Sequence, residues 1–214
     1  MKSNLALFLS FLLPLTAFFT NLSLAFSDDL DQVVDADGNP IVSGLTYYIL
    51  PAVYGPFGGG FKLAQTGNSD CPLTVLQDYS EAFRGLPVKF SSSGTIFTGN
   101  ELEIEFVDKP ECEESSKWLV FLDEAINKLC VGIGGAQGHP TELTFDGKFH
   151  IEEYQYGYKL AFCITAPPTC SPIGRFDAEN HEDGRRLILT EDDEEFYIVF
   201  VKASAADKVM KSVV

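Results

Sequence analysis

The sequence is poor in basic residues and lacks the motifs that mark common enzyme classes. It has 15 Lys and Arg against 31 Asp and Glu, which gives a formal net charge of −16. A protein that neutralises nucleic-acid phosphates or anionic lipids needs a basic surface, so we expect this protein to bind neither nucleic acid nor an anionic membrane surface. GxSxG, HExxH, CxxC and a phosphate-binding loop are absent. The acid-rich composition leaves a carboxylate pair for glycoside hydrolysis open, but no pair stands out.

The sequence has only three histidines and five cysteines. The histidines lie near turns or on alternating strand patterns, so we expect no catalytic residue, no metal site and no cofactor; they are His139, His150 and His181. In an oxidising compartment an odd cysteine count indicates disulfide pairs plus one free thiol, and spacing alone leaves the pairing open. The cysteines are Cys71, Cys112, Cys130, Cys163 and Cys170.

Long apolar runs are missing except at the start of the chain. Leu5–Phe19 is mostly apolar, follows Lys2 and precedes the small residues of Ser23–Ala25. This run is interrupted by Pro14 and is shorter than the roughly 20 residues of a membrane span. The pattern predicts a signal peptide at residues 1–25 that is removed in the secretory pathway, leaving one domain at residues 26–214 and no membrane anchor.

No window of the chain carries a helical period over three turns, and short strand-like runs recur instead. Leu102–Phe106 alternates apolar and polar residues, as a strand with one solvated face does. This pattern predicts an all-β protein, a closed barrel or a sandwich of about twelve short strands. The expected strands are Tyr47–Leu50, Phe61–Gln65, Leu73–Gln77, Val88–Phe90, Leu102–Phe106, Trp118–Leu122, Leu129–Ile133, Phe149–Glu153, Tyr158–Cys163, Gly174–Phe176, Leu187–Thr190 and Phe196–Lys202.

Residues 33–49, VVDADGNPIVSGLTYYI, are the most specific stretch of the sequence. Asp, Gly, Asn and Pro crowd into a tight turn, and a strand-like run follows. The order Val33, Asp35, Asp37, Gly38, Asn39, Ile41, Tyr47, Ile49 resembles the N-terminal signature of the plant Kunitz-type (soybean trypsin inhibitor, miraculin-like) family. Later stretches agree in the family's order: residues 71–75, 85–88, 131–135, 158–163 and 185–187.

The resemblance implies a β-trefoil, a three-fold pseudo-symmetric barrel of antiparallel strands, in a monomeric plant defence protein that is extracellular or vacuolar. It also implies the disulfides Cys71–Cys112 and Cys163–Cys170. Cys130 then stays a free thiol, and its apolar surroundings in the sequence favour a buried, inert one.

The resemblance further implies inhibition of a serine protease, with the protease as protein partner. Members of the family present one exposed loop between the fourth and fifth strands as a substrate mimic, and Ser43 is expected to support this loop from beneath. The preorganised loop loses little entropy when it binds. The contact residues implied here are Ser91, Ser92, Ser93, Gly94, Thr95, Ile96, Phe97 and Thr98.

Three departures from the family pattern argue against strong trypsin inhibition. The loop is short, and no Lys or Arg lies between Lys89 and Lys109 to meet the acidic pocket of trypsin. Ser43 stands where the family uses an Asn, which has a longer reach. Small loop residues suit an elastase-like or subtilisin-like pocket, and Ile96 or Phe97 suits a deeper one. An alternative for Ile96 and Phe97 is that they begin the fifth strand and are core residues. A separate alternative for the function is a non-inhibitory storage, stress or interaction protein on the same fold.

Overall fold

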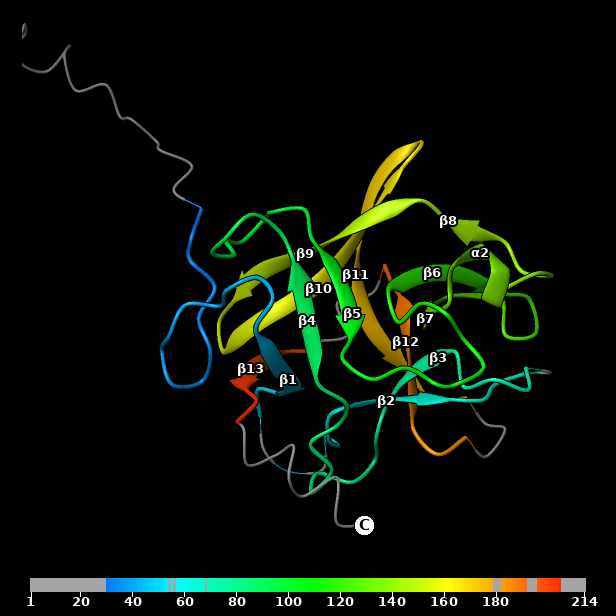
Figure 1. Cartoon of the computed structure of the whole chain (residues 1–214), viewed down its shortest axis with the longest axis horizontal. Coiled ribbons are helices and arrows are strands. Elements are labelled where there is room, and N and C mark those ends of the chain that lie inside the picture. The colour runs from blue at the N-terminus through cyan, green and yellow to red at the C-terminus, as the bar shows by residue number, and fades with distance from the viewer. Residues whose placement is uncertain are drawn as a thin grey trace, which may run out of the picture. The chain divides into compact units, whose positions relative to one another are not determined.

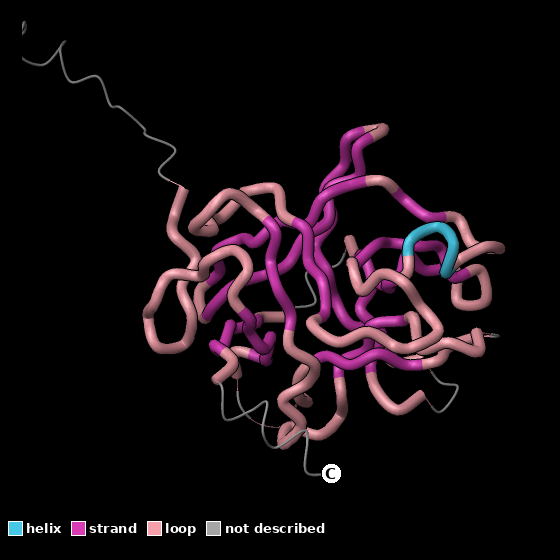
Figure 2. Tube along the Cα trace, viewed as in Figure 1, coloured by secondary structure: helices cyan, strands magenta, loops and turns pink. Residues whose placement is uncertain are grey.

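β-Branched and aromatic residues alternate with turn residues along the chain, and in a computed structural model this pattern forms short antiparallel strands (Figure 2). The structure describes residues 30–53, 55, 57–67, 69–178, 182–191 and 196–204, so the expected signal peptide lies outside it. In these ranges the elements are β1 (Thr46–Pro51), β2 (Phe61–Ala64), β3 (Thr74–Gln77), β4 (Val88–Ser91), β5 (Glu103–Phe106), β6 (Trp118–Asp123), β7 (Lys128–Ile133), α2 (Gly135–Gly138), β8 (Thr144–Phe145), β9 (Gly147–Tyr154), β10 (Gly157–Thr165), β11 (Pro168–Phe176), β12 (Arg185–Leu189) and β13 (Ile198–Lys202).

Six of these strands form a closed ring. β1 pairs with β4 and β13, β4 pairs with β5, and β10 pairs with β9 and β13. A bridge between Leu102, just before β5, and Phe149 of β9 closes the ring. Because every strand of a closed ring has two neighbours, the barrel leaves no edge open to other chains.

Three hairpins cover one end of this ring. They are β2–β3, β6–β7 and β11–β12, and each is paired to the other two. One hairpin from each third of the chain therefore meets the other two around a common axis (Figure 1). Six barrel strands and three cap hairpins make a β-trefoil, which confirms the predicted fold. The sequence pattern did not predict the two-residue strand β8 or the four-residue helix α2.

The barrel is filled by aromatic side chains from all three thirds of the chain. The ring of Trp118 lies 5.3 Å from that of Phe106, 5.8 Å from that of Phe149 and 5.9 Å from that of Phe61, measured between centroids. Fully burying one such side chain stabilises the fold by about 2–3 kcal/mol. This shared core holds β4 and β5, and with them the loop that connects them, in one position.

A second, partly polar core lies under the cap hairpins. Arg186 is only 1% exposed; its Nε donates to Glu182, and its Nη1 donates to Asp123. Burial opposes the charge of Arg186, but the hydrogen bonds to Glu182 and Asp123 outweigh it and raise the pKa of Arg186. Burial also raises the pKa of the neighbouring Cys130 thiol to about 11. Cys130 is therefore a buried, protonated and unreactive thiol at neutral pH.

Two disulfides join Cys71 to Cys112 and Cys163 to Cys170, the pairing that the resemblance implies. The first closes a separation of 41 residues beside the cap. The second staples the far end of the β10–β11 hairpin, which projects from the body (Figure 1). In the ranges that the structure describes, no helix is long and apolar enough to cross a membrane.

Candidate protease-binding loop

The loop between β4 and β5 has an exposed tip made of small residues. Ser91, Ser93 and Gly94 are exposed, and Ser92 and Thr95 are partly buried. Gly94 has a φ of +80°, which favours glycine and turns the chain back toward the barrel. The tip follows β4 directly (Figure 1), so the last residue of a barrel strand sets its position.

The second half of the loop lies against the body of the protein. The Ile96 amide donates to the carbonyl of Ile41, and the Val33 amide donates to the carbonyl of Ile96, both at 3.0 Å. Isolated bridges pair Thr95 with Val42 and Phe97 with Gln32. The N-terminal segment thus holds residues 95–97 as a strand would.

This arrangement corrects one part of the expected contact surface. The Ile96 side chain is 0% exposed, so its assignment to the protease-contacting residues is wrong, and it belongs to the core. The alternative is right that Ile96 is a core residue and wrong that it begins the fifth strand, because β5 begins at Glu103. Phe97 and Thr98 are partly buried, and the Thr98 amide donates to the carbonyl of Asp31 at 2.8 Å. The exposed tip is therefore Ser91–Thr95, and Phe97 and Thr98, which are partly buried like Ser92 and Thr95, stay in the expected contact surface.

Ser43 connects the two ends of the tip. Its Oγ donates to the carbonyl of Phe90 at 3.0 Å and accepts from the amide of Ser92 at 3.3 Å. Its own amide donates to the carbonyl of Gly94 at 2.9 Å. A hydroxyl reaches both partners because Ser43 lies directly beneath a short tip, so the shorter side chain still supports this loop. Side-chain length alone predicts weaker support from Ser43 than from Asn, but the closeness of the tip compensates for the shorter side chain.

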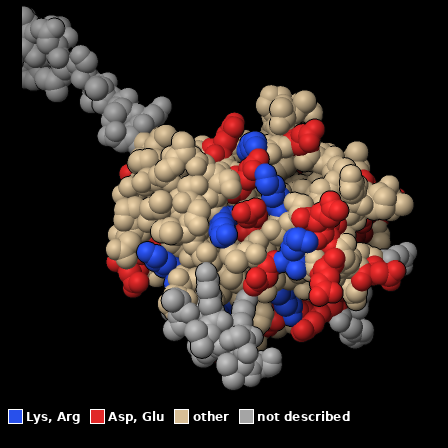
Figure 3. Space-filling model, in the orientation of Figure 1, with Lys and Arg blue, Asp and Glu red and all other residues tan. Residues whose placement is uncertain are grey.

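A surface ion cluster, which the sequence did not indicate, lies where the loop enters β5. Glu103 lies 2.8 Å from both Lys117 and Lys148. The hydrogen bonds from Lys117 and Lys148 lower the pKa of Glu103 to about 2. In Figure 3 acidic and basic side chains intermingle on the face that is drawn, so the net negative charge does not form one continuous patch there.

The two described histidines have contact partners outside the tip Ser91–Thr95. His139 is buried against Phe121, with ring centroids 4.2 Å apart, and its Nε2 lies 2.9 Å from the carbonyl oxygen of Ile133. His150 contacts the carbonyl of Gly99 through Nδ1. His181 lies outside the described residues. Within those residues no group of three or more His, Cys, Asp and Glu side chains is placed to hold a metal ion.

The sequence is similar to those of several named protease inhibitors. The chain is 54% identical to the Kunitz-type trypsin inhibitor-like 1 protein of Pisum sativum, with both chains covered completely. It is 52% identical to the subtilisin inhibitor CLSI-II of Canavalia lineata, over 86% of this chain and 99% of that protein.

Solved structures of Kunitz-type trypsin inhibitors also resemble this chain. A Kunitz-type trypsin inhibitor from Cicer arietinum is 54% identical and superposes with a TM-score of 0.77, covering 82% of this chain and 100% of that one. Soybean trypsin inhibitor in its complex with porcine pancreatic trypsin is 30% identical, with a TM-score of 0.67, covering 81% of this chain and 100% of that one. A family model, legume Kunitz, described as trypsin and protease inhibitor, matches residues 33–202. The chain therefore belongs to the Kunitz-type family of plant trypsin and protease inhibitors, which are inhibitors and not enzymes.

Proposed function

We propose that the protein inhibits a serine protease by placing the tip Ser91–Thr95 in the active-site cleft. The observation that carries this proposal is the position of the tip, which is exposed and yet held on both sides by backbone hydrogen bonds to Ser43 and its neighbours. A loop that is already ordered loses little conformational entropy on binding. An interface of about 1,600 Å², the usual size for protease–inhibitor pairs, then suffices for tight binding.

The same hydrogen bonds give a reason for slow hydrolysis of the tip. The carbonyl of Phe90, directly before the tip, accepts hydrogen bonds from the Gly44 amide and Ser43 Oγ, and the carbonyl of Gly94, near the end of the tip, accepts one from the Ser43 amide. If the protease cuts between them, both new ends stay anchored beside each other. The cut ends then rejoin or remain bound, and the complex persists.

The composition of the tip sets the proposed class of target. Ser, Gly and Thr fill only a small or shallow specificity pocket, and no cation lies between Lys89 and Lys109 for a pocket with an acidic floor. We propose a subtilisin-like or elastase-like protease in preference to trypsin. The Canavalia lineata relative, named a subtilisin inhibitor, supports this choice.

We further propose, first, that the protein enters the secretory pathway and acts outside the cell or in the vacuole, and second, that it acts as a monomer. The two disulfides support an oxidising compartment. N-terminal mass spectrometry of the protein from its native tissue tests the first part, with a mature chain beginning at Phe26 as the expected result. Light scattering at the concentration of the inhibition assay tests the second, and a stable dimer would contradict it.

Titration of the purified protein against subtilisin, elastase and trypsin tests the function. We expect nanomolar inhibition of subtilisin or elastase and weak or no inhibition of trypsin. Ser93→Trp puts a bulky ring on the exposed tip and should weaken inhibition at least 100-fold. Leu143→Trp, at a side chain that is 60% exposed elsewhere, is the matched control and should change nothing.

A gain-of-function pair sharpens the test. Ser92→Arg or Ser93→Arg supplies the cation that a trypsin pocket requires, and one of them should inhibit trypsin at least tenfold more strongly than the wild type. Inhibition that survives Ser93→Trp would place the contact surface elsewhere. If the wild type inhibits none of the three proteases, the storage, stress or interaction alternative is favoured.

A further inference from the structure

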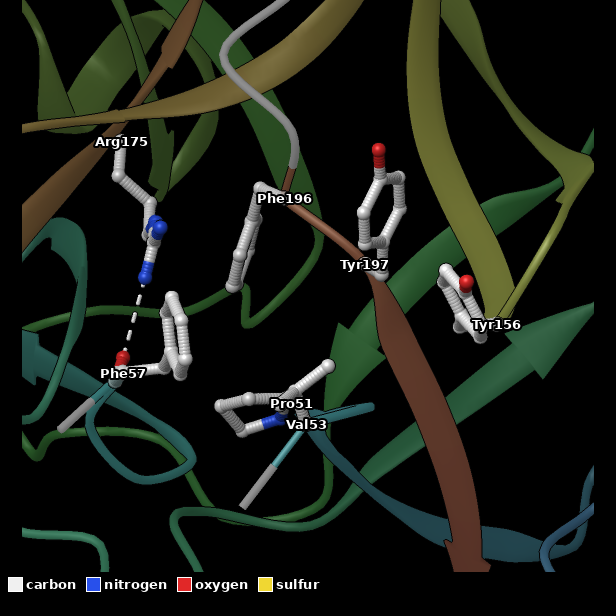
Figure 4. A pocket seen from close by; sticks show the side chains of 7 residues that line it. All are labelled: Pro51, Val53, Phe57, Tyr156, Arg175, Phe196 and Tyr197. Atoms are coloured by element: carbon white, nitrogen blue, oxygen red, sulfur yellow. Dashed lines mark hydrogen bonds between the residues drawn. The ribbon is translucent and has the colours of Figure 1, made fainter. Parts of the chain in front are cut away.

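The barrel carries an aromatic cavity at the end of β1 that points away from the protease-binding tip. The cavity has a volume of about 200 Å³, and four aromatic rings line it, from Phe57, Tyr156, Phe196 and Tyr197 (Figure 4). Phe57 and Tyr156 are 44% and 68% exposed, large values for apolar rings. They belong to the β1–β2 connection and to the β9–β10 turn, so the fold brings distant segments together at this point.

The walls of the cavity are fixed by contacts among the lining residues and their neighbours. The Tyr197 ring is stacked on Tyr154, with centroids 4.4 Å apart and planes 13° apart. On the other side, the Arg175 guanidinium carbon lies 4.7 Å from the centroid of Phe196, and Arg175 Nη1 donates to the carbonyl of Phe57 at 3.0 Å. Figure 4 shows Arg175 and Tyr197 on opposite sides of Phe196. A ligand would therefore enter a preformed site.

The volume and the lining determine the class of ligand. A dry cavity of about 150 Å³ holds benzene, and sites for drug-sized molecules begin at about 300 Å³, so this cavity suits one or two fused rings. A sugar requires several hydrogen-bonding side chains, whereas the described lining is mainly aromatic, with Pro51 and Val53 completing it. Arg175 is the one charged residue in the described lining, and a guanidinium favours a carboxylate.

We propose that this cavity binds a small planar aromatic carboxylate, with its rings between the aromatic walls and its carboxylate toward Arg175. Acidic residues lie next to lining residues in the sequence, at 191–195 directly before Phe196 and at Asp177 two positions after Arg175, so the preference for an anion rests on the guanidinium of Arg175 alone. The four rings provide the contact area, and the guanidinium provides the preference for an anion.

The proposed ligand site is separate from the protease-binding tip. β1 and β4 are antiparallel, with Thr46 opposite Lys89 and Tyr47 opposite Val88. The tip continues from the end of β4, whereas the cavity lies past Pro51 at the other end of β1. A bound aromatic acid therefore leaves the tip free, and ligand binding does not depend on the proposed inhibition.

Isothermal titration with 2-naphthoate tests the proposal, together with chemical-shift mapping of the amides around Phe57 and Tyr156. We expect saturable binding of one molecule and shifts confined to these segments. Val53→Trp adds a bulky ring to a side chain that is 44% exposed and should weaken binding at least tenfold by filling the cavity. Leu143→Trp is the matched control and should bind like the wild type. Both variants should show wild-type thermal unfolding.

Two further comparisons test the chemistry. The neutral amide 2-naphthamide should bind at least fivefold more weakly than 2-naphthoate, and Arg175→Gln should remove that difference. Cyclohexanecarboxylate, which is not planar, should bind more weakly than either. Absence of saturable 2-naphthoate binding, or equal binding by Val53→Trp and the wild type, would overturn the proposal. Equal binding of the acid and the amide by the wild type would overturn the role of Arg175.

Discussion

Two exposed tips of this protein are held in opposite ways. The β4–β5 tip is held without a covalent link, by hydrogen bonds from Ser43 and by the burial of Ile96. The β10–β11 tip is closed by the Cys163–Cys170 disulfide and by pairing within its own hairpin. The first tip depends on residues about 50 positions away in the sequence (Ser43 and Phe90, for example, are 47 apart), whereas the second depends on nearer residues, in β11 and at 146–148. The protease-binding tip should therefore respond to changes in the barrel core, whereas the hairpin tip should not.

The strongest test of this comparison is Ile96→Ala. Ile96 is 0% exposed, and truncating a fully buried isoleucine costs about 2–5 kcal/mol of unfolding free energy. We expect urea unfolding to show a loss of about 3 kcal/mol and the inhibition constant to rise, because the anchor of the tip is loosened. Thr169→Ala on the exposed hairpin tip is the control and should leave both quantities unchanged. If Ile96→Ala inhibits the protease as strongly as the wild type does, the burial of Ile96 does not hold the tip in place.

Removing the covalent staple should have the next largest effect on stability. The Cys163–Cys170 bridge closes a separation of 7 residues, for which the chain-entropy model gives about 2.5 kcal/mol. We expect the double variant Cys163→Ser and Cys170→Ser to unfold at lower denaturant concentration by that amount. Its inhibition constant should stay that of the wild type, and a large rise would assign protease contact to the hairpin.

Ser43→Ala removes the hydroxyl beneath the tip. The loss of two hydrogen bonds at a partly buried position should cost about 1 kcal/mol and weaken inhibition more than it weakens stability. Ser43→Thr keeps a hydroxyl and should restore inhibition. If Ala and Thr behave alike in the inhibition assay, the backbone hydrogen bonds alone hold the tip.

The smallest effect concerns Glu103 at the exit of the loop. Its pKa lies at about 2 in the folded protein against an ordinary value of 4.5, so its stabilising contribution is complete above pH 4.5 and disappears as the pH falls toward 2. Because the side chain is 39% exposed, the contribution is below about 1 kcal/mol. Glu103→Gln should therefore be slightly less stable than the wild type at pH 7 and equal to it at pH 2. A difference that persists at pH 2 would show that the effect is not ionic.

The strand pattern was predictable from the sequence because it depends on local properties. Each of the twelve expected strands overlaps a strand of the structure, and the loop lies between β4 and β5 as the resemblance implied. The turn residues and the period-two alternation act over a few positions, so they can be recognised without the fold. β8 and α2 were missed because two and four residues carry no detectable period.

The candidate sites were less predictable because they depend on distant contacts. Nothing near Ile96 in the sequence distinguishes an exposed contact residue from a core residue; its burial follows from pairing with Ile41 and Val33. The buried charge of Arg186 likewise requires Asp123, which is 63 residues away. The aromatic cavity joins Phe57, Tyr156 and Tyr197, which no sequence window contains together.

The sequence by itself determined the alternation of strands and turns, the family and the uncharged chemistry of the tip. Only the tertiary structure decided that Ile96 is core and ends the exposed tip, which partners Ser43 bonds beneath it and that a cavity forms at the other end of β1. The physical reason is range: backbone propensity and turn geometry act between neighbours, whereas burial and hydrogen bonding between segments exist only once the barrel has closed.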